Sequence, residues 1–150
     1  MANGIEQVKE LRDRTGLSVS KVKEALDQAG GDIEKAAEAL KSQGASVAEK
    51  KASRETSQGI VETYVHSNRK IGVMVKLLCE TDFVARNEEF TNLAHEIALQ
   101  IASMDPTDVS DLLEQAFIKD PSMKIQDLVQ HLIAKLGENI QIDSFIRFSI

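Results

Sequence analysis

The chain has one cysteine, two prolines, no tryptophan and no apolar run long enough to span a membrane. A single cysteine cannot form a disulfide within the chain, which fits a protein that stays in a reducing compartment. The first residues lack the basic start and the apolar stretch of a secretory signal, and a membrane-spanning helix would need about 20 apolar residues. We therefore expect a soluble, cytoplasmic protein without a membrane partner.

The chain has fewer basic than acidic residues, with 18 Lys and Arg against 24 Asp and Glu, and its net charge is −6. Nucleic-acid-binding surfaces neutralise phosphates with clustered Lys and Arg. Lys50, Lys51 and Arg54 form such a cluster, but Glu49 and Glu55 flank it and no aromatic residue is interleaved. This pattern favours a solvated face. We expect no direct contact with nucleic acid and a protein as the partner.

Motifs for catalysis and for metal binding are also missing. The three histidines, His66, His95 and His131, lie far apart, and the sequence has no Gly-rich phosphate loop. Cys79 has the inward parity of a predicted strand, which favours a buried structural thiol over a nucleophile. We therefore expect no enzyme activity, no metal and no cofactor.

Residues 1–44 have the spacing of three short helices. Ser18 and Asp32 are predicted to cap the second and third helices, and Gly44 follows the third. The apolar stripes contain few large side chains and no aromatic residue, so the predicted module is small and gains stability by docking on another surface. Its arrangement resembles a ubiquitin-associated-type three-helix module, a shape used mainly for protein binding.

Residues 45–58 are polar and small, and they predict a linker whose composition favours partial helix formation. From Gly59 the apolar period becomes two, which predicts strands at 60–66 and 71–80 joined by a four-residue turn. In the second strand the odd-numbered residues are expected to face the core. The domain prediction is thus a module at 1–44, a linker at 45–58 and a core at 59–150.

The rest of the core alternates between helical and strand patterns. We expect an amphipathic helix at 88–103 capped by Asn87, a short helix after Thr107 that includes Phe117, and a helix at about 123–136. Alternating apolar residues then predict a strand from Ile140 to the end of the sequence. The predicted fold class is α+β, with about three antiparallel strands packed with helices on one face.

Residues 80–87 read Glu-Thr-Asp-Phe-Val-Ala-Arg-Asn and fall where the second strand is expected to end. A short loop between two rigid elements holds a functional side chain firmly while leaving it reachable, so Asp82 and Phe83 are candidates for a working tip. A structural alternative stays open at this point. In it, Phe83 closes the end of the core and Asp82 caps a helix, as these residue types commonly do.

This stretch resembles the Thr-Asp-Phe-Val-Ala signature of the bacterial elongation factor Ts family, the nucleotide exchange factors of elongation factor Tu. The resemblance continues in the family's order over nearly the whole chain, through segments 8–16, 22–26, 31–40, 71–73 and 137–140. Long members of the family carry two copies of the core module, whereas this chain has the length for one. The chain is therefore similar to the short form of the family.

The resemblance implies that the chain promotes GDP release from elongation factor Tu without covalent chemistry. Asp82 and Phe83 would enter the partner near its magnesium and phosphate site, and the supporting residues would be Thr81, Val84 and Ala85. The amino-terminal module would dock a separate patch of the same partner. Arg12 and Lys23 match family contact positions, and Val19 stands where the family usually has a larger apolar or sulfur-containing side chain.

Two further expectations follow from this organisation. Because there is one core module, the resemblance implies that two copies pair as a homodimer through the sheet or the carboxy-terminal strand. The alternative function is a non-catalytic adaptor that binds ubiquitin-like or nascent-chain partners through the three-helix module. That alternative leaves the Asp82-Phe83 loop without a role.

Overall fold

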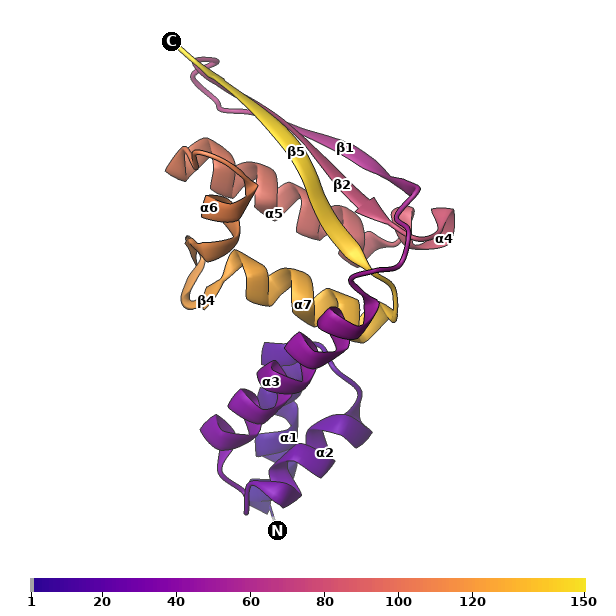
Figure 1. Ribbon diagram of the computed structural model, residues 1–150. Helices are drawn as coiled ribbons and strands as arrows, with labels where there is room; N and C mark the ends of the chain where they lie inside the picture. The colour runs from indigo at the N-terminus through magenta and orange to yellow at the C-terminus, as the bar shows by residue number, and fades with distance from the viewer. Residues whose placement is uncertain (1) are drawn as a thin grey trace.

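A computed structural model describes residues 2–150 of the chain, with side chains from residue 4 onward. Figure 1 shows three helices at the amino-terminal end, below a larger part in which helices cover one face of a sheet. The amino-terminal helices are α1 (Ala2–Thr15), α2 (Val19–Gln28) and α3 (Ile33–Lys51). The order of three helices followed by strands and helices confirms the predicted α+β fold class.

Both predicted caps of the amino-terminal helices are confirmed. Ser18 accepts a hydrogen bond from the Lys21 N–H at 3.4 Å, and Asp32 accepts one from the Lys35 N–H at 3.0 Å. These helices enclose a separate buried cluster of aliphatic side chains, namely Leu11, Leu17, Val22, Ala25, Leu26, Ala36 and Leu40.

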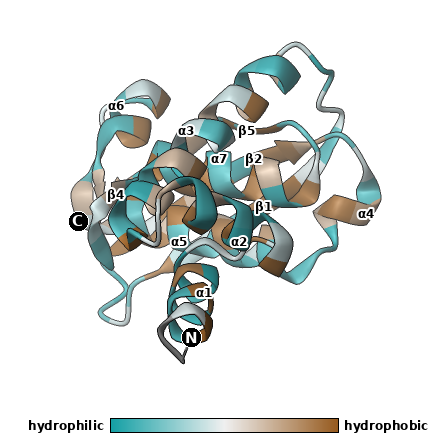
Figure 2. Ribbon diagram, turned by 90° about the horizontal axis from the view of Figure 1, so that it is seen from below, coloured by the Kyte–Doolittle hydropathy of each residue, from teal (hydrophilic) through white to brown (hydrophobic). Residues whose placement is uncertain are grey.

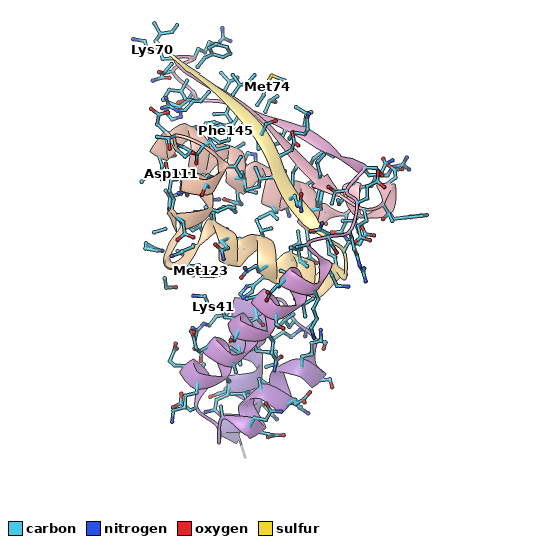
Figure 3. All side chains as sticks on the ribbon, viewed as in Figure 1. Lys41, Lys70, Met74, Asp111, Met123 and Phe145 are labelled. Atoms are coloured by element: carbon cyan, nitrogen blue, oxygen red, sulfur yellow. The ribbon has the colours of Figure 1, made fainter. Side chains whose placement is uncertain are left out.

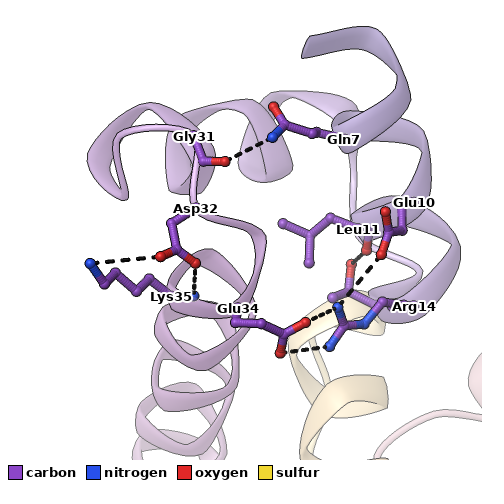
Figure 4. A network of polar contacts seen from close by, with 9 residues as sticks. Gln7, Glu10, Leu11, Arg14, Gly31, Asp32, Glu34 and Lys35 are labelled. Carbon is purple, nitrogen blue, oxygen red and sulfur yellow. Dashed lines mark hydrogen bonds and ion pairs between the residues drawn. The ribbon is translucent and has the colours of Figure 1, made fainter. Parts of the chain in front are cut away.

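Polar contacts around the amino-terminal cluster tie its helices together (Figure 4). Arg14 on α1 forms an ion pair with Glu34 on α3 at 2.8 Å, and the Gln7 side chain donates to the Gly31 carbonyl at 2.9 Å. Because Arg14 and Glu34 are exposed, their ion pair contributes little stability compared with the apolar cluster beneath it. The contacts fix how α1 lies across the other two helices.

Helix α3 passes through Gly44 and continues to Lys51. Gly44 is buried, and a side-chain carbon at this position would lie 3.7 Å from the Gln130 carbonyl oxygen of helix α7 (Ile125–Leu136). Val47 and Ala48 pack against the main core. The first half of the expected linker is therefore helix, which its composition had favoured. Separate folding of the two parts remains a prediction.

The main sheet contains β1 (Gln58–Val65), β2 (Ile71–Cys79) and β5 (Ile140–Ser149), with β2 in the centre and antiparallel pairing on both sides. Helices α5 (Glu88–Met104), α6 (Val109–Glu114) and α7 cover one face (Figure 1). The odd-numbered residues of β2 from Val73 to Cys79 are buried, as predicted, in a core that includes Phe90, Ile97 and Ile101. Within residues 2–150, every helix is too short or too polar to cross a membrane.

A bulge in β5 changes which of its residues face the core. Lys76 pairs with Ser144 while Leu77 pairs with Ile142, so Asp143 is the extra residue of the bulge and lies opposite no residue of β2 in the register, although its carboxylate forms an ion pair with Lys76 at 3.5 Å. An extra residue in one strand reverses the faces beyond it. Ile140 and Ile142 are buried, whereas Ile146 and Phe148 are exposed on the other face. The regular alternation had predicted the strand correctly without indicating this reversal.

A small hairpin between α6 and α7 was not predicted. It consists of β3 (Ala116–Phe117) and β4 (Asp120–Lys124), so the expectation that Phe117 belongs to a helix was wrong. The buried side chain of Gln100 holds the hairpin, because its amide donates to the Ala116 carbonyl at 3.0 Å and accepts from the Ile118 N–H at 3.0 Å. A buried amide from another helix has no local sequence signal.

Candidate functional site

The Asp-Phe segment forms a one-turn helix, α4 (Asp82–Ala85), which follows β2 at one end of the sheet (Figure 1). Thr81 caps this helix, since its hydroxyl accepts from the Val84 N–H at 3.4 Å. Asp82 is the first helical residue and pairs with Arg86 at 2.7 Å. The structural alternative in which Asp82 is the cap was therefore wrong, because Thr81 occupies that position.

Phe83 points away from the core and is 89% exposed. The alternative in which this ring closes the end of the core is therefore also wrong. Val84 is half-buried and packs against the main core, and Ala85 is buried within it. The predicted loop residues thus divide into an outward pair, Asp82 and Phe83, and an inward set that anchors them. Figure 2 shows α4 as a hydrophobic segment at the edge of the molecule.

A carboxylate from a distant part of the chain holds the segment in front of α4. Glu138 accepts hydrogen bonds from the Glu80 N–H at 3.1 Å, from the Thr81 N–H at 2.9 Å and from the Thr81 hydroxyl at 2.6 Å. In the sequence, the segment from Gly137 to Ile140 stands out only through the family resemblance. No local pattern connects residues 57 positions apart, so reasoning from the sequence missed this support.

Cys79 lies beneath the same segment and is fully buried. Its thiol donates to the Thr81 carbonyl at 3.2 Å, and burial, together with the nearby Glu138 carboxylate, raises the pKa of Cys79 to about 11. A thiol with this pKa stays neutral near pH 7 and is a poor nucleophile. Within residues 2–150, acidic, thiol and imidazole groups form no cluster able to hold a metal ion.

A second surface lies between α1 and α2, where a groove of about 830 Å³ is open to solvent. The three residues predicted for partner binding in this module, Arg12, Val19 and Lys23, all line the groove. Val19 and Ile5 expose apolar surface there. The charged residues along the groove are Lys9, Arg12 and Lys23 together with Asp13 and Asp27, so this concave, partly apolar surface suits a protein segment that combines apolar side chains with charges of both signs.

The two predicted surfaces do not merge into one site. Figure 1 places α4 at the end of the sheet, away from α1 and α2, whose residues line the groove. A single partner would therefore have to be large enough to reach both surfaces. This separation favours a folded protein partner over a short peptide.

The outer face of the sheet is a third exposed surface. Its apolar residues are Val61 and Val65 on β1, Met74 on β2, and Ile146 and Phe148 on β5. The pairing of Met74 with Ile146 and of Gly72 with Phe148 places them on one continuous patch. Figure 3 shows Met74 on the side away from the helices and Phe145 on the side that faces them. Contiguous apolar surface of this kind marks an interaction site.

The chain has extensive sequence similarity to known proteins. Residues 80–150 match the family described as Elongation factor TS. Elongation factor Ts of Thermodesulfovibrio yellowstonii is 39% identical over 194 aligned positions, which include all of this chain and 97% of the relative. Elongation factor Ts of Herpetosiphon aurantiacus is 37% identical, again over the whole of this chain and 98% of the relative. The protein of the same description from Thermosipho melanesiensis is 40% identical over 95% of this chain.

Proposed function

The chain belongs to the elongation factor Ts family, and from this membership we propose that it promotes GDP release from elongation factor Tu during translation elongation in the cytoplasm. The observation that carries the proposal is the position of Phe83, an 89% exposed residue on a short helix whose last two residues, Val84 and Ala85, pack into the core. An isolated apolar ring at a rigid tip is suited to enter a pocket of a partner. The family resemblance assigns that pocket to the nucleotide-binding domain of elongation factor Tu.

Exchange follows from differential binding and needs no covalent step. If the chain binds nucleotide-free elongation factor Tu more tightly than the GDP-bound form, then it must weaken GDP binding by the same factor. Insertion of Phe83 near the partner's magnesium site supplies such a difference, because the metal ion compensates the charge of the phosphates. Asp82 adds a negative charge beside the ring, and this charge disfavours a phosphate group in the same place. The chain therefore acts as an exchange factor and not as an enzyme.

The amino-terminal groove supplies a second contact with the same partner. Arg12 and Lys23 provide cationic groups at its rim and Val19 provides apolar surface. Because the groove does not touch the ring of Phe83, it can contribute affinity in both the GDP-bound and the nucleotide-free complex. Such uniform binding raises the fraction of partner that is engaged without itself driving release.

We also propose that two copies pair through the outer face of the sheet. The apolar side chains there would be covered, and a two-fold axis would place the same patch on both subunits. Met74→Asp should shift the protein to monomer in sedimentation experiments. Asn68→Asp, which adds the same charge at the exposed turn after β1, is the control and should not. A monomeric parent protein at micromolar concentration would refute the pairing.

The rival function is a general adaptor that uses only the three-helix module. The groove between α1 and α2 fits that function as well, but an adaptor of this kind leaves the exposed Phe83 unexplained. The rival predicts that Phe83→Ala binds partners normally and that no partner loses nucleotide. Nucleotide release therefore separates the two functions.

The direct experiment is the release of labelled GDP from elongation factor Tu of the same source. We expect substoichiometric amounts of the chain to accelerate release, since an exchange factor turns over. Phe83→Ala should reduce the acceleration at least about tenfold while leaving the fold intact. Release that stays unchanged across a concentration series of folded parent protein would refute the proposed function.

A further inference from the structure

The carboxylates of Glu80 and Glu138 link the backbones of two segments at the base of α4, and we call these hydrogen bonds the clasp. Glu138 accepts from the N–H groups of Glu80 and Thr81, and the Glu80 side chain in turn accepts from the Asn139 N–H at 2.7 Å. Hydrogen bonds to a charged acceptor are stronger than those between neutral groups. The arrangement joins the end of β2 to the start of β5 by side chains, at the point where α4 leaves the sheet.

The connection from the amino-terminal helices enters the same junction. Asn139 is buried, and its side-chain amide donates to the Arg54 carbonyl at 2.8 Å. The Arg54 guanidinium lies 3.5 Å from the Glu80 carboxylate. Three stretches of chain therefore meet around residues 138 and 139, and one of them leads directly to Phe83.

Helix α4 cannot hold its own orientation. It has one turn, and an isolated turn of helix is unstable because its ordering cost is not repaid by its few hydrogen bonds. Its direction must come from contacts at its two ends. Val84 and Ala85 anchor the far side in the core, and the near side is fixed at Thr81, whose N–H and hydroxyl both bond to Glu138.

The position of Glu138 follows from the end of α7. Gly137 ends that helix with φ of 77°, a conformation that glycine adopts without the strain a side chain would introduce. This turn places Glu138 directly after the helix, beside β2. Glu138 is half-buried and bonded to Glu80 and Thr81, whereas Phe83 and Asp82 face outward. Glu138 is therefore placed to orient the tip rather than to contact the partner.

We propose that Glu138 is a positioning residue for nucleotide exchange, which it serves by fixing Thr81 and thereby the direction of Phe83. This inference rests on the proposed exchange function. Loss of the clasp should lower the maximal rate of GDP release, because fewer complexes hold the ring in its productive place. The concentration of chain needed for half-maximal release should change little, because the groove between α1 and α2 remains intact.

The test compares three substitutions at one position. Glu138→Ala removes all the hydrogen bonds, and Glu138→Asp keeps the charge but withdraws the carboxylate by one methylene. Glu138→Gln keeps an oxygen that can accept from both N–H groups and should largely restore the parent behaviour. Glu55→Ala is the control, since Glu55 is exposed and has no ion pair within residues 2–150.

Two measurements are needed, and the first does not involve the partner. Amide hydrogen exchange at Glu80 and Thr81 should become at least about tenfold faster in the Ala and Asp variants but not in the Gln variant. The maximal rate of GDP release should fall by about tenfold in the same two variants. If Glu138→Ala does not fold, the comparison of Glu138→Asp with Glu138→Gln decides whether the hydrogen bonds of Glu138 are needed for exchange.

Each of the two measurements can overturn the proposed role of Glu138. Unchanged amide protection at Thr81 in the folded Asp variant would overturn the clasp, and full maximal release despite lost protection would overturn its role in exchange. A drop in the Gln variant equal to that in the Ala variant would also overturn the inference. Failure of the proposed function looks different, because the parent protein itself would then not accelerate GDP release.

Discussion

The two hydrophobic cores of the molecule differ in size and in the side chains that fill them. Among the residues whose side chains the structure describes, 4–150, the main core contains 20 that are buried, including the fully buried Phe90, and it is bounded by the sheet and α5 to α7. Over the same residues, the amino-terminal cluster contains seven that are buried and no aromatic side chain. Because stability grows with buried apolar area, the amino-terminal helices have much less stability of their own than the core.

Each core supports a different proposed contact. The large core anchors α4, so Phe83 stands on the most stable part of the molecule. The groove lies on the helices of the small cluster. This cluster gains stability because α3, which belongs to it, also packs along α7 of the main core. The ion pair between Lys41 on α3 and the buried Asp127 on α7, at 3.3 Å, belongs to this junction. We therefore expect the tip at Phe83 to be rigid and the groove between α1 and α2 to be more adaptable.

The largest expected effect comes from two phenylalanines seven positions apart. Phe90 is fully buried and Phe83 is 89% exposed. Phe90→Ala should lower the free energy of unfolding by about 3 to 5 kcal/mol, since it leaves a cavity in the main core. Phe83→Ala should lower it by less than about 0.5 kcal/mol. Thermal and denaturant unfolding measure both changes.

The same pair separates stability from function. Phe83→Ala should lose exchange while keeping its melting temperature, whereas the folded fraction of Phe90→Ala should keep exchange. Severe destabilisation by Phe83→Ala with normal exchange would contradict the comparison, because it would return that ring to the core.

The second effect concerns the small cluster. Leu40 is buried there on α3, and Leu40→Ala should cost about 2 to 5 kcal/mol by leaving a cavity. If the small cluster unfolds on its own, the loss appears as an early transition confined to the amino-terminal helices while the sheet stays folded. Hydrogen exchange resolved by residue measures this. Ile5→Ala is the control, because Ile5 is exposed and its loss should be nearly neutral.

A single cooperative transition in Leu40→Ala would show that the two cores unfold together. The predicted division at residues 44 and 59 would then be wrong. The continuous α3, with Gly44 buried against α7, makes this a sharp test, since the helix crosses the first predicted boundary.

Features set by neighbouring residues were predictable from the sequence. The caps at Ser18, Asp32 and Asn87 and the stop at Gly137 depend on local hydrogen bonds and local backbone conformation, and the structure has them as predicted. The inward face of β2 followed from its alternation of side chains. The exposed Asp82-Phe83 tip came from its place at the end of a strand and from the family resemblance, because residue types alone favoured burial.

Features set by distant residues were not predictable. The bulge at Asp143 depends on the pairing of β5 with β2, and it sends Phe148 outward although the alternation of residues continues. The cap of α4 is Thr81 and not Asp82, because the backbone turns one residue earlier than the sequence suggests. The support from Glu138 joins segments that only the folded sheet brings together.

The third effect tests the groove. Arg12→Ala and Lys23→Ala should each weaken binding to elongation factor Tu by about tenfold, or about 1.4 kcal/mol, without lowering the melting temperature, because both side chains lie on the exposed rim. Isothermal titration calorimetry measures the affinity. Lys21→Ala on the same helix, outside this groove, is the control. Equal weakening by Lys21→Ala would indicate a general charge effect rather than a docking site.

The smallest effect concerns the junction between the two cores and depends on pH. His131 on α7 lies beside Gly44 of α3, and its Nε2 is buried without a hydrogen-bond partner within residues 2–150. Burial lowers the pKa of His131 from its ordinary value of 6.5, and Lys41 lowers it further while Asp127 opposes the shift. Below about pH 6.5 the unfolded chain therefore binds a proton that the folded chain resists, so stability is lost as the pH falls. The slope of melting temperature between pH 7.5 and 5.5 should be shallower in His131→Gln than in the parent protein.

The control for this pH dependence is His95→Gln, because His95 is exposed on α5. Identical slopes in the parent and in His131→Gln would show that this junction does not respond to protonation, and the small core would then depend on α3 packing alone.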